Sequence, residues 1–219
     1  RTASTNAEKT LIPYLKSRGV SRLDVLVLTH TDADHMGDML EVAKHFSIKE
    51  IYVSKGSLTQ PDFVQKLEQI ESSVHVVEVG DEIPVFDSAL QVLYPIGTGD
   101  GGNDDSIVLY GEFFQTKFLF TGDLERQGET ELLQRFPQLT ADVLKAGHHG
   151  SKGSSSPEFL EQIQPKLALI SAGQNNRYRH PHQETLQRFE KFNTAIYRTD
   201  QQGAIRLIGW NSWRIETVH

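Results

Sequence analysis

Residues 23 to 28 form a run that is apolar except for Asp24, and four potential metal ligands follow it within a six-residue stretch. An apolar run of this length predicts a buried strand. Side chains two residues apart at the end of a strand point to one side, so His30 and Asp32 can converge on one ion. Asp34 and His35 are adjacent and require a turning loop, which can carry them to a second ion. Imidazoles and carboxylates in this pattern are typical of zinc, manganese or iron sites, whereas the plain alternative is a polar loop.

Four later segments repeat this arrangement of polar residues just beyond a predicted strand. They contain Asn103 to Ser106, Asp123, the pair His148 and His149, and His180. In layered α/β folds the loops at one end of a sheet converge, and functional sites collect there. The sequence therefore predicts one site that is assembled from distant parts of the chain.

Local patterns predict the elements between these segments. Residues 5 to 18 are predicted to form a helix that Pro13 kinks, because proline removes a backbone hydrogen bond. Alternating and continuous apolar runs predict strands at 48–53 and 167–171. A helix is predicted at 61–70, where the apolar residues recur at helical spacing.

The 219 residues suffice for one substantial domain or two, with the composition of an ordinary globular protein. No apolar run reaches the roughly 18 residues of a membrane-spanning helix, so no membrane insertion by this segment itself is expected. The sequence starts at Arg1, which predicts a piece of a longer protein. The net charge of −7 argues against bulk attraction to nucleic acid, although bound cations would cancel several carboxylates. Cysteine is absent, which excludes disulfides and thiolate ligands.

The polar motifs together resemble those of metallo-β-lactamase-fold hydrolases. More narrowly, the chain resembles the C-terminal domain of the ComEC family, the membrane channel proteins of natural DNA uptake (competence). The narrower resemblance rests on the segments NDDSIVL (103–109), LFTGD (119–123), LKAGHHGSK (144–152) and SAGQNNRYRHP (171–181). It covers nearly the whole chain, although the family's opening strands are not visible before the first helix.

The resemblance implies an α/β fold of the αββα four-layer sandwich type, the metallo-β-lactamase fold, lacking its first strands. It implies a single domain over residues 1–219 that is a fragment of a larger membrane protein. The parent is expected in the cell membrane, with this domain extracellular. The implied cofactors are two divalent metal ions, which activate water and stabilise the charge on a phosphoryl group under attack.

The resemblance also assigns roles to the motif residues. The metal ligands are expected to be His30, Asp32, Asp34, His35, Asp123, His148 and His149. His30 and Asp32 belong to one ion, Asp34 and His35 to the other, and Asp123 bridges them. Only one of the paired histidines is expected to be a ligand, with His148 preferred. The expected catalytic residues are Asp34, Asp123 and His180.

Two departures from the family pattern bear on the metal. Asp32 stands where the β-lactamases have histidine, and the third ligand position holds Asn103 or its neighbours. An oxygen-richer ligand set shifts the preference toward harder ions, so manganese is expected beside zinc. One class of zinc β-lactamase also needs a cysteine ligand, which argues against antibiotic hydrolysis here.

Residues around the motifs are candidates for substrate contact. Lys152, Arg177 and Arg179 can form a local positive rim, and Tyr178 can stack on a nucleobase. Asn103 and Ser106 are further candidates. The plain alternative is a solvated surface charge for the basic residues and a loop-anchoring role for Tyr178. His180 is a candidate general acid for the leaving oxygen or a substrate contact, with a packing role as the alternative.

The leading hypothesis is a metal-dependent phosphodiesterase, a nuclease that acts on DNA during natural transformation and degrades the strand that is not imported. Its expected partners are DNA and the remainder of the membrane channel protein. One alternative is a small-molecule phosphodiesterase or phosphorylcholine-type esterase, since related hydrolases share the first motif. Another is a degenerate, noncatalytic module that guides DNA, because the third histidine is missing.

Overall fold

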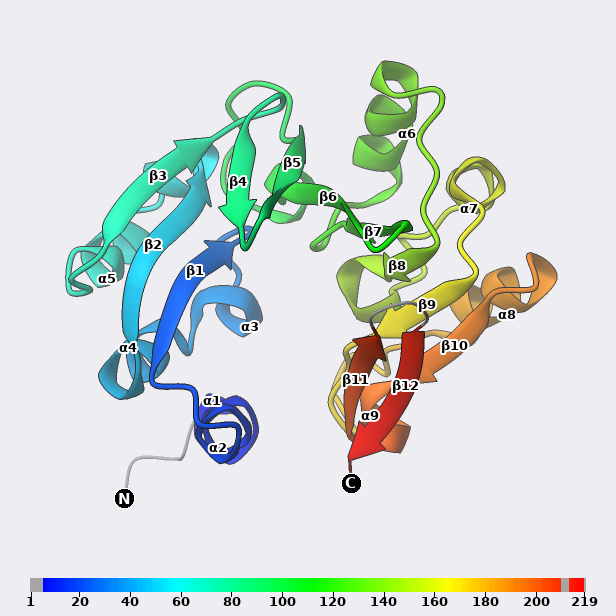
Figure 1. Cartoon of the computed structure of the whole chain (residues 1–219). Coiled ribbons are helices and arrows are strands. Elements are labelled where there is room, and N and C mark those ends of the chain that lie inside the picture. The colour runs from blue at the N-terminus through cyan, green and yellow to red at the C-terminus, as the bar shows by residue number, and fades with distance from the viewer. Residues whose placement is uncertain (1–5, 210–212, 219) are drawn as a thin grey trace. The chain divides into compact units, whose positions relative to one another are not determined.

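The computed structural model describes residues 6–209 and 213–218. The chain divides into two compact units (Figure 1). Unit 1 comprises residues 1–81 and 95–107, and unit 2 comprises residues 82–94 and 108–219. Each unit is built on its own sheet, so the motif residues are supplied by two separate scaffolds. The single domain expected over residues 1–219 stays a prediction.

Unit 1 contains a three-stranded parallel sheet in the order β1-β2-β3. These strands are β1 (Arg22–Leu28), β2 (Ser47–Ser54) and β3 (Ser73–Val77). The helices α4 (Met39–His45) and α5 (Pro61–Leu67) connect them, as parallel strands require a crossover. Buried apolar residues from the strands and helices form one cluster, which includes Leu28, Met39, Val42, Ile51, Val53, Phe63 and Leu67.

The first predicted helix is two helices in the structure. They are α1 (Asn6–Lys9) and α2 (Leu11–Ser17), so the expected kink is a break at Thr10. A proline ring clashes with the carbonyl group four residues earlier, and for Pro13 that residue is Lys9. The helical hydrogen bonding therefore ends at α1 and restarts with the bond from Tyr14 N to Thr10 O.

Unit 2 contains a seven-stranded mixed sheet in the order β10-β9-β8-β7-β6-β5-β4. Its strands are β4 (Glu82–Val85), β5 (Ser88–Tyr94), β6 (Val108–Phe113), β7 (Thr116–Phe120), β8 (Val143–Lys145), β9 (Leu167–Ile170) and β10 (Ala195–Arg198). Strands β4 to β7 pair antiparallel, whereas β7 to β10 pair parallel. The loops that follow β7, β8 and β9 consequently leave from the same end of the sheet, where the carboxyl ends of these strands lie.

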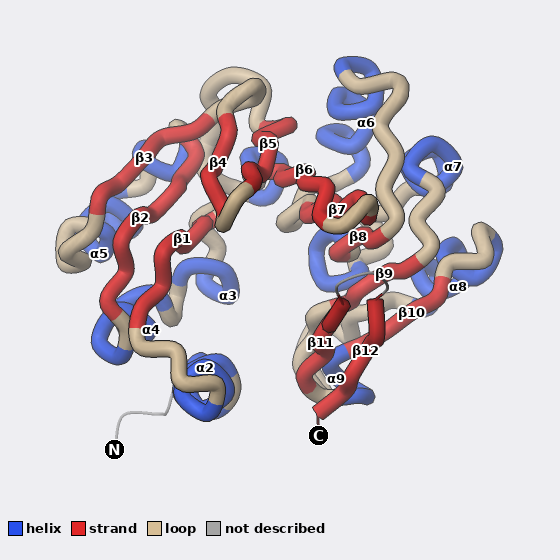
Figure 2. The backbone as a smooth tube through the Cα atoms, viewed as in Figure 1, coloured by secondary structure: helices blue, strands red, loops and turns tan. Residues whose placement is uncertain are grey.

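The two faces of this sheet are covered differently (Figure 2). The helices α6 (Arg126–Arg135), α7 (Pro157–Ile163) and α8 (Gln183–Lys191) pack on one face. The hairpin of β11 (Ala204–Gly209) and β12 (Trp213–Val218) packs on the other, and the short helix α9 (Thr199–Gln202) precedes it. Alternation along the strands explains this division. In β7, Leu119 belongs to the helix-side cluster, and Phe118 contacts the hairpin through Trp213.

Short helical turns carry most of the motif residues. They are α3 (Ala33–Met36) in the first motif, η2 (Asn103–Asp105) before β6, and η3 (Gly147–Gly150) after β8, while η1 (Gly56–Thr59) follows β2. The sequence predicted loops at the first three places. None of the helices within residues 6–209 has the length and hydropathy needed to cross a bilayer.

Candidate metal centre

In unit 1 the first motif follows β1 and then turns into a short helix. His30 is fully buried two residues beyond the end of β1, and α3 begins directly after Asp32. The imidazole rings of His30 and His35 lie 4.0 Å apart between centroids. The ligand atoms of Asp34 and His35 lie within 4.8 Å of each other, as do those of His30 and His35. Because α3 coils the chain, the two histidines come together across the five-residue step that separates them.

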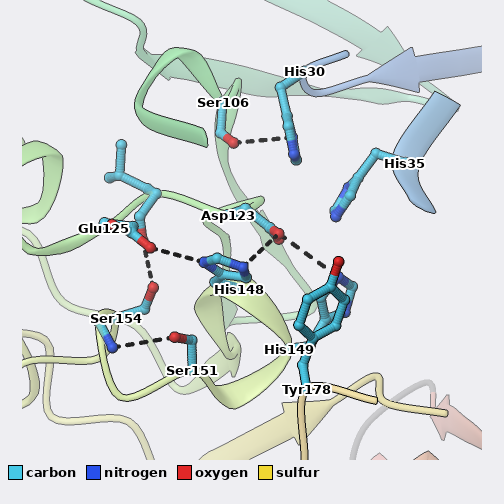
Figure 3. A network of polar contacts seen from close by, with 12 residues as sticks. His30, His35, Ser106, Asp123, Glu125, His148, His149, Ser151, Ser154 and Tyr178 are labelled. Carbon is cyan, nitrogen blue, oxygen red and sulfur yellow. Dashed lines mark hydrogen bonds and ion pairs between the residues drawn. The ribbon is translucent and has the colours of Figure 1, made fainter. Parts of the chain in front are cut away.

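Both imidazoles of the first motif are contacted at Nδ1 by hydroxyl groups. For His30 the partners are Thr29 Oγ1 at 3.1 Å and Ser106 Oγ at 3.2 Å, the latter drawn in Figure 3. Thr29 Oγ1 also lies 3.5 Å from Nδ1 of His35. A hydrogen bond at one ring nitrogen determines which nitrogen is available to a metal. These contacts present Nε2 of His30 as its ligand atom.

In unit 2 two imidazoles converge on one carboxylate. Asp123 is almost completely buried, at 2% exposed. Its Oδ2 lies 3.7 Å from Nε2 of His148 and 3.6 Å from Nε2 of His149 (Figure 3). Adjacent side chains diverge in regular structure, but His148 and His149 have φ values of 44° and 52°. Left-handed backbone is uncommon for such residues and is concentrated at functional sites.

The other ring nitrogen of each paired histidine has an oxygen partner. Nδ1 of His148 lies 3.0 Å from Glu125 Oε1, and Nδ1 of His149 lies 2.7 Å from the carbonyl oxygen of Ser171. A carbonyl oxygen only accepts hydrogen bonds, so His149 Nδ1 donates and its Nε2 carries the lone pair. Carboxylates and backbone carbonyls are the usual outer partners of metal-ligating histidines. Both histidines therefore have the orientation of metal ligands, with Nδ1 on an outer partner and Nε2 toward Asp123. The expectation that His148 is the ligand of the two stays a prediction.

Sequence reasoning did not identify Glu125 or the carbonyl group of Ser171. Glu125 stands two residues after Asp123, and its position beside a ligand motif is the one signal that the sequence offers. The carbonyl group of Ser171 belongs to the backbone and has no residue-type signature at all.

The ring of His180 lies against the paired histidines. Its ring centroid is 5.3 Å from that of His148 and 6.3 Å from that of His149. Asn176 holds the backbone on both sides, because His180 N donates to Asn176 Oδ1 at 2.9 Å and Asn176 Nδ2 donates to His180 O at 2.6 Å. The loop thus delivers this ring to the same cluster from a distant part of the sequence.

The candidate substrate residues of unit 2 surround His180. The ring of Tyr178, which is 54% exposed, stacks on His180 with centroids 5.7 Å apart. The guanidinium group of Arg177 lies 4.5 Å from the centre of the Tyr178 ring. Lys152 is exposed, and its backbone N–H donates to His182 Nδ1 at 3.0 Å. In unit 1, Asn103 is half-buried in η2 and Ser106 is buried against His30.

Titration of His180 tests this arrangement in the metal-free protein. Burial, followed by the imidazoles of His148, His182 and His149, lowers the pKa of His180 to about 4. A lowered pKa means that the ring loses its proton as the pH rises through about 4, so it is neutral at pH 7. We expect its C2 proton resonance to stay constant between about pH 5.5 and 8. A midpoint near the ordinary value of about 6.5 would contradict this environment.

Comparison with known proteins identifies chains of similar sequence. The profile of the metallo-beta-lactamase superfamily matches residues 2–174. ComE operon protein 3 of Bacillus subtilis (strain 168) is 44% identical over 203 residues, which are 91% of this chain and 26% of that protein. Competence protein ComA of Neisseria gonorrhoeae is 33% identical over 204 residues, 91% of this chain and 27% of that protein. The chain spans about a quarter of the length of these relatives.

A solved structure shows the same fold. The metallo-beta-lactamase fold protein YhfI from Bacillus subtilis aligns with a TM-score of 0.52 at 11% identity, covering 86% of this chain and 78% of that one. The fold class expected from the motifs is therefore confirmed. The resemblance to the ComEC family is confirmed as well, by the relatives named above.

Proposed function

Because the chain belongs to the metallo-beta-lactamase superfamily, we propose that it is a metal-dependent phosphodiesterase that cleaves DNA. The observation that carries the proposal is the pair of imidazoles in unit 2, each oriented at Nδ1 and each facing the carboxylate of Asp123 with Nε2. The superfamily supplies the reaction class. The choice of DNA as the substrate rests on the resemblance to the ComEC family, and it is supported by a relative that is named a competence protein.

The donor groups fit divalent metal ions. Imidazole nitrogens and carboxylates suit zinc and manganese, and the outer partners at Nδ1 leave Nε2 for the ion. The residues that would hold two ions are His30, Asp32, Asp34, His35, Asp123, His148 and His149. When bound, the ions supply Lewis acidity that lowers the pKa of water and stabilises charge on a phosphoryl group.

The remaining work belongs to side chains of the chain itself. His180, whose ring lies against His148 and His149, would act as the general acid for the leaving oxygen or contact the substrate. Lys152 and Arg177 would bind neighbouring phosphates, and Tyr178 would stack on a base. Asn103 would add a polar contact.

The parent protein that we infer is a channel protein of DNA uptake. One relative is named a competence protein and another is named for the ComE operon, and this chain covers only about a quarter of each. We place the domain on the outer side of the cell membrane, joined to the rest of the channel. There it would degrade the strand that is not imported.

Metal removal tests the function directly. Labelled single- and double-stranded DNA would be incubated with the purified chain and Mn²⁺, Zn²⁺, Mg²⁺ or a chelator. We expect cleavage with Mn²⁺ or Zn²⁺ and none with the chelator, because the ions supply the transition-state charge stabilisation. Asp34→Ala, which removes a ligand, is expected to lower the rate at least about tenfold. Asp62→Ala removes an exposed carboxylate of α5 and serves as the matched control.

Two other outcomes would redirect the proposal. Turnover of bis-nitrophenyl phosphate or a phosphorylcholine ester without DNA cleavage would indicate a small-molecule phosphodiesterase. DNA binding that survives both chelation and Asp34→Ala, without any cleavage by a folded and metal-loaded sample, would indicate a noncatalytic DNA-guiding module.

A further inference from the structure

The third ligand position of the family pattern falls in a loop of unit 1. This loop contacts His30 through a serine hydroxyl group. Ser106 is completely buried, and its Oγ lies 3.2 Å from Nδ1 of His30. Thr29 Oγ1 lies 3.1 Å from the same nitrogen. Two hydroxyl groups therefore share Nδ1 of this imidazole, and neither is placed at Nε2. The loop contributes an outer contact to His30 where the family pattern has a histidine ligand.

The residue before Ser106 fixes the loop in position. Asp105 is 1% exposed, and its Oδ2 accepts hydrogen bonds from Ser54 Oγ at 2.7 Å and from Gly101 N at 3.2 Å. Ser54 Oγ also lies 2.8 Å from Ser57 Oγ, so the carboxylate ends a buried chain of polar groups. A buried carboxylate that is hydrogen-bonded in this way is costly to displace, so it holds η2 in one place.

The residue after Ser106 is fixed as well. Ile107 N donates to Thr29 O at 3.0 Å, which joins the loop to the end of β1. On the N-terminal side of Ser106, Thr31 N and Thr31 Oγ1 both donate to Gly101 O at 2.9 Å. Ser106 is therefore clamped on both sides to the segment that carries His30.

Glycines around Asp105 show how closely the carboxylate is enclosed. A Cβ atom at Gly56 would lie 2.0 Å from Asp105 Oδ2, and one at Gly99 would lie 2.3 Å from Oδ1. No side chain fits at those distances, so glycine is required at both positions. Within the Gly- and Asp-rich segment 97–105, the packing of this buried carboxylate thus explains Gly99 and Asp105.

We propose that Ser106 is a positioning residue for His30 and that Asp105 is its anchor. Nδ1–H of His30 donates to the Ser106 hydroxyl oxygen, which fixes the ring and presents Nε2 to the ion. This inference rests on the proposed function, because it takes His30 to be a metal ligand. It gives Ser106 a role at the metal in place of the substrate contact expected from the sequence.

Metal affinity and the tautomer of His30 test the inference. Loss of an outer partner typically weakens metal binding by 10- to 100-fold. We therefore expect Ser106→Ala to raise the dissociation constant for Mn²⁺ or Zn²⁺, measured by calorimetry, by about that factor. Long-range ¹H–¹⁵N NMR of the metal-free chain is expected to show Nδ1–H at His30, and a mixture of tautomers in Ser106→Ala. Ser106→Thr keeps the hydroxyl and is expected to retain the wild-type tautomer and affinity.

Two further variants separate positioning from general stability. Asp105→Asn keeps the side-chain size but turns an amide group toward the donors, so we expect an intermediate loss of affinity. If Ser106→Ala does not fold, Asp105→Asn tests the inference in its place. An unchanged metal affinity in Asp105→Asn would overturn the inference. Ser72→Ala removes a hydroxyl that donates to Ile48 O, away from the motif, and is expected to bind metal as the wild type does.

The outcomes distinguish the inference from the function on which it rests. A wild-type chain that binds no divalent metal would overturn both. A wild-type chain that binds metal, with Ser106→Ala binding equally well and with an unchanged His30 tautomer, would overturn the inference alone.

Discussion

Replacing Asp123 with asparagine is expected to reduce metal-dependent DNA cleavage by roughly 1000-fold, which corresponds to about 4 kcal/mol of transition-state stabilisation. The carboxylate is buried, and the Nε2 atoms of His148 and His149 both face its Oδ2. Asparagine keeps the shape of the side chain but removes its charge, and its amide nitrogen cannot ligate a metal. The measurement is the cleavage rate with saturating Mn²⁺ or Zn²⁺, together with the metal content of the purified variant.

Asp142→Asn provides the matched control in the same unit. Asp142 precedes β8, at the opposite end of the strand from His148, and its carboxylate accepts from Lys117 N and pairs with Lys166. We expect this variant to lose some stability and to keep the wild-type rate. An Asp123→Asn protein that is folded and retains more than about a tenth of the wild-type rate would show that the carboxylate is not at the reacting centre.

The elements of the fold were largely predictable because each has a local cause. The strand expected at 48–53 is β2, and the helix expected at 61–70 is α5, which ends three residues earlier. Periodicity gives the type of an element more reliably than its ends, which depend on caps and tertiary contacts. The helix expected at 5–18 was wrong in one respect, because Pro13 divides it into two helices instead of kinking one.

The candidate ligand residues could be picked out from the sequence, whereas their outer partners could not. His30, His35 and Asp123 belong to motifs of characteristic spacing. The partners at Nδ1 include a backbone carbonyl and hydroxyls, which occur everywhere in a sequence. Asp104 and Asp105 are adjacent and chemically identical, yet one is exposed and the other is buried as the anchor of a loop. Which of the two turns inward depends on η2, and no spacing rule predicts it.

Replacing Glu129 with alanine is expected to lower the free energy of unfolding by about 3–5 kcal/mol. Glu129 is 2% exposed in α6, and its carboxylate accepts from the N–H groups of Ser155 and Ser156. Each hydrogen bond to a charged group contributes roughly 1.5–3 kcal/mol, and alanine would leave both buried donors without an acceptor. These donors belong to the serine-rich loop that follows His149, so the same variant is expected to loosen the paired histidines. Denaturant unfolding measures the stability loss.

The position of Glu129, and not its charge alone, is the cause of this expected loss. Glu158→Ala is the matched control, because it removes a glutamate that forms an exposed ion pair with Arg126. The Glu158 side chain is 65% exposed and the Arg126 side chain 66%. An exposed ion pair contributes at most about 1 kcal/mol to the free energy of unfolding. Glu129→Gln keeps one acceptor oxygen and is expected to lose about half as much as the alanine variant. A loss below about 1 kcal/mol in Glu129→Ala would mean that water replaces the carboxylate at the loop. The serine-rich segment would then be held by the guanidinium group of Arg188, which donates to Ser154 O at 2.8 Å.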